Sequence, residues 1–162
     1  ANQIGVNGAQ SLATSLNLKN LETLFLDSNP IGPEGVEALA KSTCLPSLTA
    51  LHMDSTGIGD QGVKAIAASQ TLSKIKKLYM CSNKIGDEGA IALSQSPNLS
   101  HLTCLSIWRN EIRDAGGKAI AESNHFLKLE RLYMSLNLIE KPTRKLIRAS
   151  DMASRLKTLV MD

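Results

Sequence analysis

The sequence predicts an α/β solenoid: a right-handed arc of strand–helix units, with a parallel β-sheet on its concave face and helices on its convex face. Shifting the chain by 27 residues superimposes its apolar positions almost from end to end. Each unit opens with alternating apolar and polar residues, typical of a strand with one buried face, and continues with apolar residues at helical spacing. One such unit cannot bury its apolar face alone, so neighbouring units must stack.

The strand part of each unit is defined by apolar columns 27 residues apart. The first column is Leu21, Leu48, Ile75, Leu102, Leu129 and Leu156. The second is Leu24, Leu51, Leu78, Leu105, Leu132 and Leu159. The third is Leu26, Met53, Met80, Ile107, Met134 and Met161. A mainly asparagine column follows, and we expect its side chains to turn inward and satisfy backbone groups between repeats: Asn29, Thr56, Asn83, Asn110 and Asn137.

The helical part of each unit carries small and acidic residues at fixed places. A glycine column lies near each predicted helix start, where a missing Cβ permits close packing: Gly8, Gly35, Gly62, Gly89 and Gly116. Asp60, Asp87 and Asp114 come just before the helices, and we expect each to cap the helix that follows it. Pro33 takes the equivalent place in its repeat, which suits the first turn of a helix.

These columns divide the chain into a single domain of stacked repeats. We predict a partial repeat at 1–20, full repeats at 21–47, 48–74, 75–101, 102–128 and 129–155, and a terminal strand at 156–162. Neither end has the polar character expected of a terminal capping unit. We therefore expect a fragment of a longer array, with self-association through the uncapped ends as a further expectation.

The repeat LxxLxLxxNxIGxxGxxALAxSxxLxx resembles the ribonuclease-inhibitor-like subclass of leucine-rich repeats, which includes bacterial members. The resemblance covers essentially the whole chain. It implies the solenoid fold with high specificity. It implies function only weakly, because proteins of this family bind unrelated partners.

Composition narrows the classes of function. A net charge of +3 is too weak to indicate nucleic acid binding. The chain has three cysteines, an odd number without the spacing of a disulfide framework, which favours reduced thiols. Reduced thiols in turn favour a cytoplasmic location, or a host cytosol if the protein is a secreted effector. No apolar run is long enough for a membrane span, so no membrane partner is expected. The sequence has no phosphate-binding glycine motif, and we expect no cofactor.

Four of the five aromatic residues lie at strand positions that point away from the predicted core: Phe25, Tyr79, Trp108 and Tyr133. Exposed aromatic residues beside arginine are typical of protein interfaces. The candidate partner-binding residues are Phe25, Asp27, His52, Asp54, Tyr79, Cys81, Trp108, Arg109, Arg131 and Tyr133. The alternative is that aromatic residues merely suit half-exposed strand positions.

Charge is also graded along this face, and a bipolar surface would orient a bipolar partner. The N-terminal side carries Glu22, Asp27 and Asp54, and the C-terminal side carries Lys76, Lys77, Arg109, Arg131 and Lys157, with Glu130 among them. Ordinary solvated charge is the alternative interpretation.

No set of catalytic residues converges. Asp27 and Asp54 are neighbours that could hold a cation, but we interpret them as solvated acids awaiting a basic partner. His52 has no serine within hydrogen-bonding reach, and His101 with Cys104 lacks a second ligand pair for zinc. The predicted function is therefore protein binding on the concave sheet face, without enzymatic activity or a metal. The alternative is regulation of a partner enzyme, as an inhibitor or activator, for example by a secreted bacterial effector or an effector antagonist.

Overall fold

The computed structural model describes residues 2–162. Its strands form one parallel sheet in chain order, confirming the predicted α/β solenoid. The strands are β1 (Thr23–Phe25), β2 (Ala50–His52), β3 (Lys77–Tyr79), β4 (Cys104–Ser106), β5 (Arg131–Tyr133) and β6 (Thr158–Val160). Each residue pairs with the one 27 positions later, as Leu24 does with Leu51 and Leu51 with Leu78. The period of the sequence is therefore the register of the sheet.

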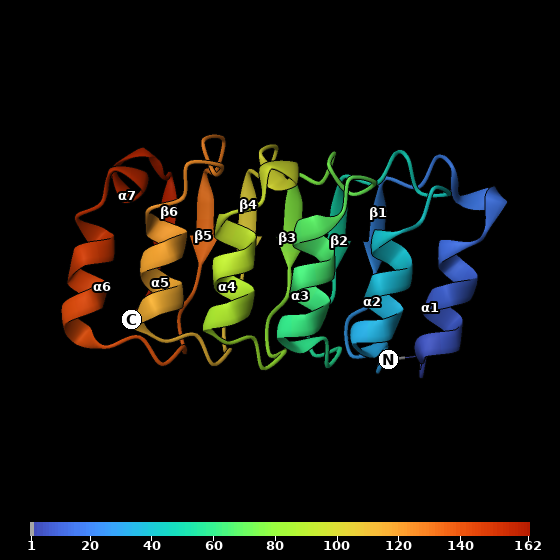
Figure 1. The fold of residues 1–162 in the computed structure, drawn as a ribbon, viewed down its shortest axis with the longest axis horizontal. Helices are drawn as coiled ribbons and strands as arrows, with labels where there is room; N and C mark the ends of the chain where they lie inside the picture. The colour runs from blue at the N-terminus through green and yellow to red at the C-terminus, as the bar shows by residue number, and fades with distance from the viewer. Residues whose placement is uncertain (1) are drawn as a thin grey trace.

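A row of helices covers one side of the sheet, with each helix beside the next (Figure 1). The α-helices are α1 (Val6–Ala13), α2 (Gly32–Ala40), α3 (Gly59–Ala68), α4 (Asp87–Ser94), α5 (Asp114–Ala121), α6 (Lys141–Arg148) and α7 (Asp151–Arg155). Short 3-10 turns, η1 (Leu16–Leu18) and η2 (Pro97–Leu99), lead into β1 and β4. We call the sheet face that points away from the helices the concave face.

The core is one continuous layer between sheet and helices. The apolar strand columns are buried along it, as are the inward helix residues Val36, Val63 and Ile120. Only the column members in the first and last strand units are half-buried: Leu21, Leu24, Leu156 and Leu159. Phe126 replaces a core leucine and is 1% exposed. Burial of every unit against its neighbours explains why the apolar columns tolerate no change of period.

The asparagine column holds adjacent repeats together, as predicted. The side-chain oxygen of Asn83 accepts the backbone N–H groups of Thr56 and Gly57 in the preceding repeat, both at 2.9 Å. Its side-chain nitrogen donates to the carbonyls of Met53 at 2.7 Å and Cys81 at 3.1 Å. Each asparagine thus satisfies main-chain groups at a bend, where neither sheet nor helix can.

Thr56 interrupts this asparagine ladder. Its hydroxyl donates to the Met53 carbonyl at 2.7 Å and to the Asn83 side-chain oxygen at 3.2 Å. The hydroxyl is too short to reach the preceding repeat, where the Asn29 and Ile31 amides bond instead to nearby carbonyls. The link between these two repeats is correspondingly weaker.

The predicted capping role of the aspartates is wrong in one respect. Each caps the helix of the next repeat and not its own, because it already lies in the first turn of its own helix. Asp60 Oδ1 accepts the amides of Gly86 at 2.7 Å and Gly89 at 3.0 Å, at the start of α4. An added Cβ at Gly89 would lie 2.5 Å from that oxygen, so the glycine column makes room for the carboxylate.

Asp87 and Asp114 repeat the arrangement one and two units later. Asp87 Oδ1 accepts the amides of Arg113 and Gly116, both at 2.8 Å. Asp114 Oδ1 accepts the Glu140 amide at 2.8 Å, and this hydrogen bond lowers the pKa of Asp114 below its ordinary value. The carboxylates also complement the positive ends of the helices that they cap.

Repeats with and without this carboxylate are followed by different turns. Gly32 and Gly59 have positive φ angles of 63° and 55°, and the repeats before them carry Val6 and Pro33 at the aspartate position. Gly86, which receives Asp60, has φ of −102°. Without a carboxylate to accept them, the amides of Gly32 and Gly59 donate to the carbonyls of Thr56 and Asn83, through a left-handed turn that glycine permits.

The asparagine ladder gives a first prediction. Asn83→Ala is expected to lower the free energy of unfolding by about 3 kcal/mol, because the buried Thr56 amide, the part-buried Gly57 amide and the buried Met53 carbonyl lose their partner. Chemical denaturation followed by circular dichroism measures this change.

The converse substitution, Thr56→Asn, is expected to raise that free energy by about 1 kcal/mol, by extending the ladder to the preceding repeat. A loss of stability in Thr56→Asn would contradict the role given to the column.

The aspartate caps give a second prediction from a matched pair. Asp87→Ala is expected to cost about 1–2 kcal/mol, and Asp60→Ala clearly less. Without its cap Gly86 can adopt the left-handed turn, whereas Arg113 would pay about 1 kcal/mol for the same turn. Denaturation of both variants side by side measures the difference, and equal losses would show that the turn does not respond to the carboxylate.

Candidate protein-binding surface

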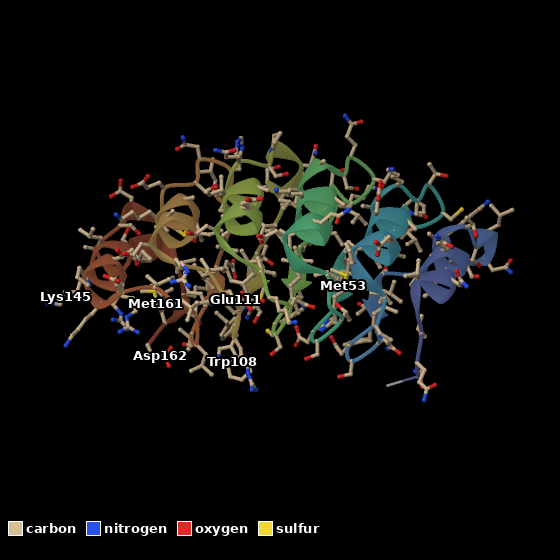
Figure 2. All side chains as sticks on the ribbon, turned by 60° about the horizontal axis from the view of Figure 1, so that its bottom comes forward. Met53, Trp108, Glu111, Lys145, Met161 and Asp162 are labelled. Atoms are coloured by element: carbon tan, nitrogen blue, oxygen red, sulfur yellow. The ribbon has the colours of Figure 1, made fainter. Side chains whose placement is uncertain are left out.

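The concave face is built from strand side chains that alternate with the core residues. Figure 2 shows Met53 between sheet and helices and Trp108 pointing away from the body of the protein. Because the strands are parallel and in register, residues 27 apart form straight rows across the face. The aromatic row is Phe25, His52, Tyr79, Ser106, Tyr133 and Val160.

The first rings of the aromatic row are stacked. The ring centroids of Phe25 and His52 lie 4.1 Å apart with an interplanar angle of 27°. Those of His52 and Tyr79 lie 4.2 Å apart at 12°. The spacing between parallel strands, about 4.8 Å, brings such rings face to face. The stack fixes its side chains before any partner arrives, which reduces the entropy lost on binding.

His52 lies within the stack, between two aromatic rings. Both faces of its imidazole are covered, and Ser106 makes its own contact with the Cys81 sulfur at 3.1 Å. The serine is buried, so it lies below the aromatic side chains. This geometry is that of a packed surface and not of a catalytic dyad.

Tyr79 leans from β3 over the neighbouring strand β4. Its hydroxyl accepts a hydrogen bond from the Cys104 thiol at 3.6 Å. Partial burial, together with Cys104, raises the pKa of Tyr79 to about 12, although Arg131 opposes the rise. The hydroxyl therefore stays protonated at neutral pH and can donate to a partner.

The second row holds Asp27, Asp54, Cys81, Trp108, Ser135 and Asp162, and part of its predicted role is wrong. Asp27 Oδ1 accepts the Asp54 amide at 2.8 Å, and Asp54 Oδ1 accepts the Cys81 amide at 2.7 Å. Both aspartates are half-buried structural acceptors, not fully solvated acids. Cys81 is only 8% exposed, so little of its side chain is open to a partner. Its small side chain lies against Ser106, which belongs to the neighbouring strand. The alternation of inward and outward residues along one strand does not predict such a contact.

Trp108 and Arg109 lie at the bend after β4. Trp108 is 39% exposed, and Arg109 is exposed with φ of 55°. Leu136, one repeat later, has φ of 53° and is 53% exposed, and Leu138 is 47% exposed. The sequence reasoning did not select these leucines. The sequence could have indicated them, because each is apolar at a position where the preceding repeat has a charged residue. For Leu138 that residue is Glu111.

Cations dominate the middle of the concave face. Lys157 is paired with Glu130 at 2.9 Å. Within residues 2–162, no ion pair involves Lys76, Lys77, Arg109 or Arg131. The structure therefore gathers the predicted aromatic residues beside positive charges that form no ion pair within residues 2–162.

Four segments of the chain match a family model described as a leucine-rich repeat: residues 15–40, 44–67, 71–94 and 98–121. Together they cover more than half of the sequence. The chain belongs to the leucine-rich-repeat family. No curated protein matches this leucine-rich-repeat sequence.

Among solved structures, the leucine-rich-repeat chain is similar to an internalin from Listeria monocytogenes str. 4b F2365, with a TM-score of 0.53 and 19% sequence identity. The alignment covers 94% of this chain and 45% of the internalin chain, so this chain spans less than half of that structure. At this identity the likeness is one of fold.

No helix of residues 2–162 combines the length and hydrophobicity needed to cross a membrane. Over the same range, no group of three or more His, Cys, Asp or Glu side chains could hold a metal ion.

Burial of the thiols gives a third prediction. Cys81 and Cys104 are 8% and 1% exposed, and burial raises the pKa of the Cys81 thiol, whereas Cys44 is half-exposed. In the native protein a thiol reagent is expected to modify Cys44 first, with the other two following slowly. Kinetics with Ellman's reagent measure the phases. A fast phase that persists in Cys44→Ser would contradict the buried placement of Cys81 and Cys104.

Proposed function

We propose that this leucine-rich-repeat chain binds another protein on its concave face. The observation that carries the proposal is the collection of Phe25, Tyr79, Trp108 and Tyr133 in two adjacent rows outside the core. Tyrosine, tryptophan and arginine supply most of the binding energy in measured interfaces. The aspartates within the rows orient the backbone, while Phe25, His52, Tyr79, Trp108, Arg109, Arg131 and Tyr133 contact the partner.

Aromatic residues could also occupy these positions through strand preference alone. That explanation does not account for their near absence elsewhere, because the only other aromatic residue, Phe126, is buried. Nor does it account for the side-by-side cations. Protein binding explains both features.

We further infer that the repeats are of the ribonuclease-inhibitor-like kind, which the period of 27 residues and the helix in each repeat support. Regulation of a partner enzyme, as by a bacterial effector or its antagonist acting in a cytosol, is the finer alternative. Assaying a captured enzyme with and without the chain distinguishes regulation from simple binding.

A fourth prediction tests the binding surface. The combined variant Tyr79→Ala, Trp108→Ala, Tyr133→Ala is expected to weaken partner capture by about 100-fold or more, because interface aromatic residues contribute about 2 kcal/mol each. Affinity capture from lysate of the source organism, with quantitative mass spectrometry, identifies the proteins that this variant loses.

The matched control is Lys118→Ala with Lys145→Ala, on the exposed surface of α5 and α6. These changes are expected to retain every partner. Partners that survive the aromatic changes but depend on the two lysines would place the binding surface on the helices and refute the proposal.

A further inference from the structure

A pair of basic side chains flanks Cys104 across the sheet. Lys77 on β3, Cys104 on β4 and Arg131 on β5 occupy one register row. Cys104 is 1% exposed because neighbouring side chains cover it, with the Tyr79 hydroxyl 3.6 Å from its sulfur, and it places no charged group between the two cations. With strands about 4.8 Å apart, an anion above Cys104 would lie within reach of both flexible side chains.

Neither cation has a partner of its own within the described chain. The acid next to Arg131 in sequence is Glu130, which pairs instead with Lys157 at 2.9 Å. Lys76 lies beside Lys77 and adds a third positive charge, also without an ion pair in residues 2–162. Like charges grouped in this way repel one another, and a bound anion relieves that repulsion.

Tyr79 adds a hydrogen-bond donor at the same place. Its hydroxyl lies 3.6 Å from the Cys104 sulfur and accepts a hydrogen bond from the thiol, so its own O–H is left to donate. The hydroxyl is close enough to Arg131 for the guanidinium to act on the pKa of Tyr79. Lys77, Arg131 and the Tyr79 hydroxyl together form what we call the carboxylate seat.

We propose that the carboxylate seat binds an acidic segment of the partner protein, with carboxylates held by Lys77 and Arg131 above Cys104. The inference rests on the proposed function and names the chemistry of the partner. Guanidinium groups and carboxylates match in geometry, and such contacts speed association as well as fixing orientation.

The rest of the concave face favours a short run of carboxylates over nucleic acid or phosphate. Glu22, Asp27 and Asp54 lie on the β1 and β2 side of the same face and repel an extended polyanion. Phosphate groups are commonly held by backbone N–H groups. Those of Cys104 and Arg131 donate to carbonyls of neighbouring strands, so the seat offers side-chain donors.

The fifth prediction uses fluorescently labelled hexaglutamate and the full chain. We expect saturable binding, measured by fluorescence anisotropy, that weakens as ionic strength rises. The double variant Lys77→Glu, Arg131→Glu is expected to weaken it by about tenfold or more, because each change replaces attraction with repulsion. Since Lys77 is exposed and Arg131 half-exposed, circular dichroism is expected to show an unchanged fold.

The control variant is Lys74→Glu, Lys128→Glu. These exposed lysines lie three residues before Lys77 and Arg131 in the same two repeats, and their reversal changes the net charge equally. Binding is expected to change by less than about twofold. An equal loss in both variants would mean that hexaglutamate senses only net charge, and would overturn the seat. The neutral variant Lys77→Gln, Arg131→Gln checks the result without added repulsion.

Two further probes separate the carboxylate from other anions. A phosphoserine peptide or an oligouridylate of equal charge is expected to bind more weakly than hexaglutamate, and tighter binding of either would reject an acidic protein segment. If the aromatic variant loses partner capture but the changes at Lys77 and Arg131 leave hexaglutamate binding unaltered, the carboxylate seat alone is rejected. Retention of partner capture in that variant would reject the proposed function itself.

Discussion

The hydrogen bonds of the asparagine column are the interaction on which the rest of the structure depends. At each bend the chain leaves a strand, and its amides point into a space that neither sheet nor helix occupies. Asn83 and Asn110 fill that space with an acceptor for the preceding repeat and a donor for the carbonyls around it. Each amide left unpaired at these positions would cost about 1–3 kcal/mol.

The repeats are linked by a second polar column that acts in the opposite direction. An asparagine oxygen reaches back to the preceding repeat, whereas Asp60 and Asp87 reach forward to cap the next helix. The conformation of Gly86 therefore depends on a residue 26 positions earlier. Local structure in this chain is set partly by its neighbouring unit, which is why the repeat array behaves as one body along the stack.

Because these columns hold the backbone, side chains on the concave face are free to differ between repeats. The aromatic row passes from Phe25 through His52 and Tyr79 to Ser106, and the charge changes from acidic to basic across the same strands. A rigid frame with variable outward positions suits recognition of one particular protein surface. The stacked rings add order to the face before binding, and the cations without an ion pair in residues 2–162 support the acidic partner proposed above.

The sequence by itself determined the solenoid, the register of the sheet and the rows of outward residues, because a period of 27 residues assigns every column to one side of the sheet. It also placed the asparagines correctly, since a buried amide side chain must bond to backbone. Only the tertiary structure decided which helix each aspartate caps and that Cys81 is buried beside Ser106. It likewise decided that Tyr79 leans over Cys104. The sequence period determines on which side of the sheet a side chain leaves the backbone. Its conformation and its burial depend on contacts with the neighbouring repeat.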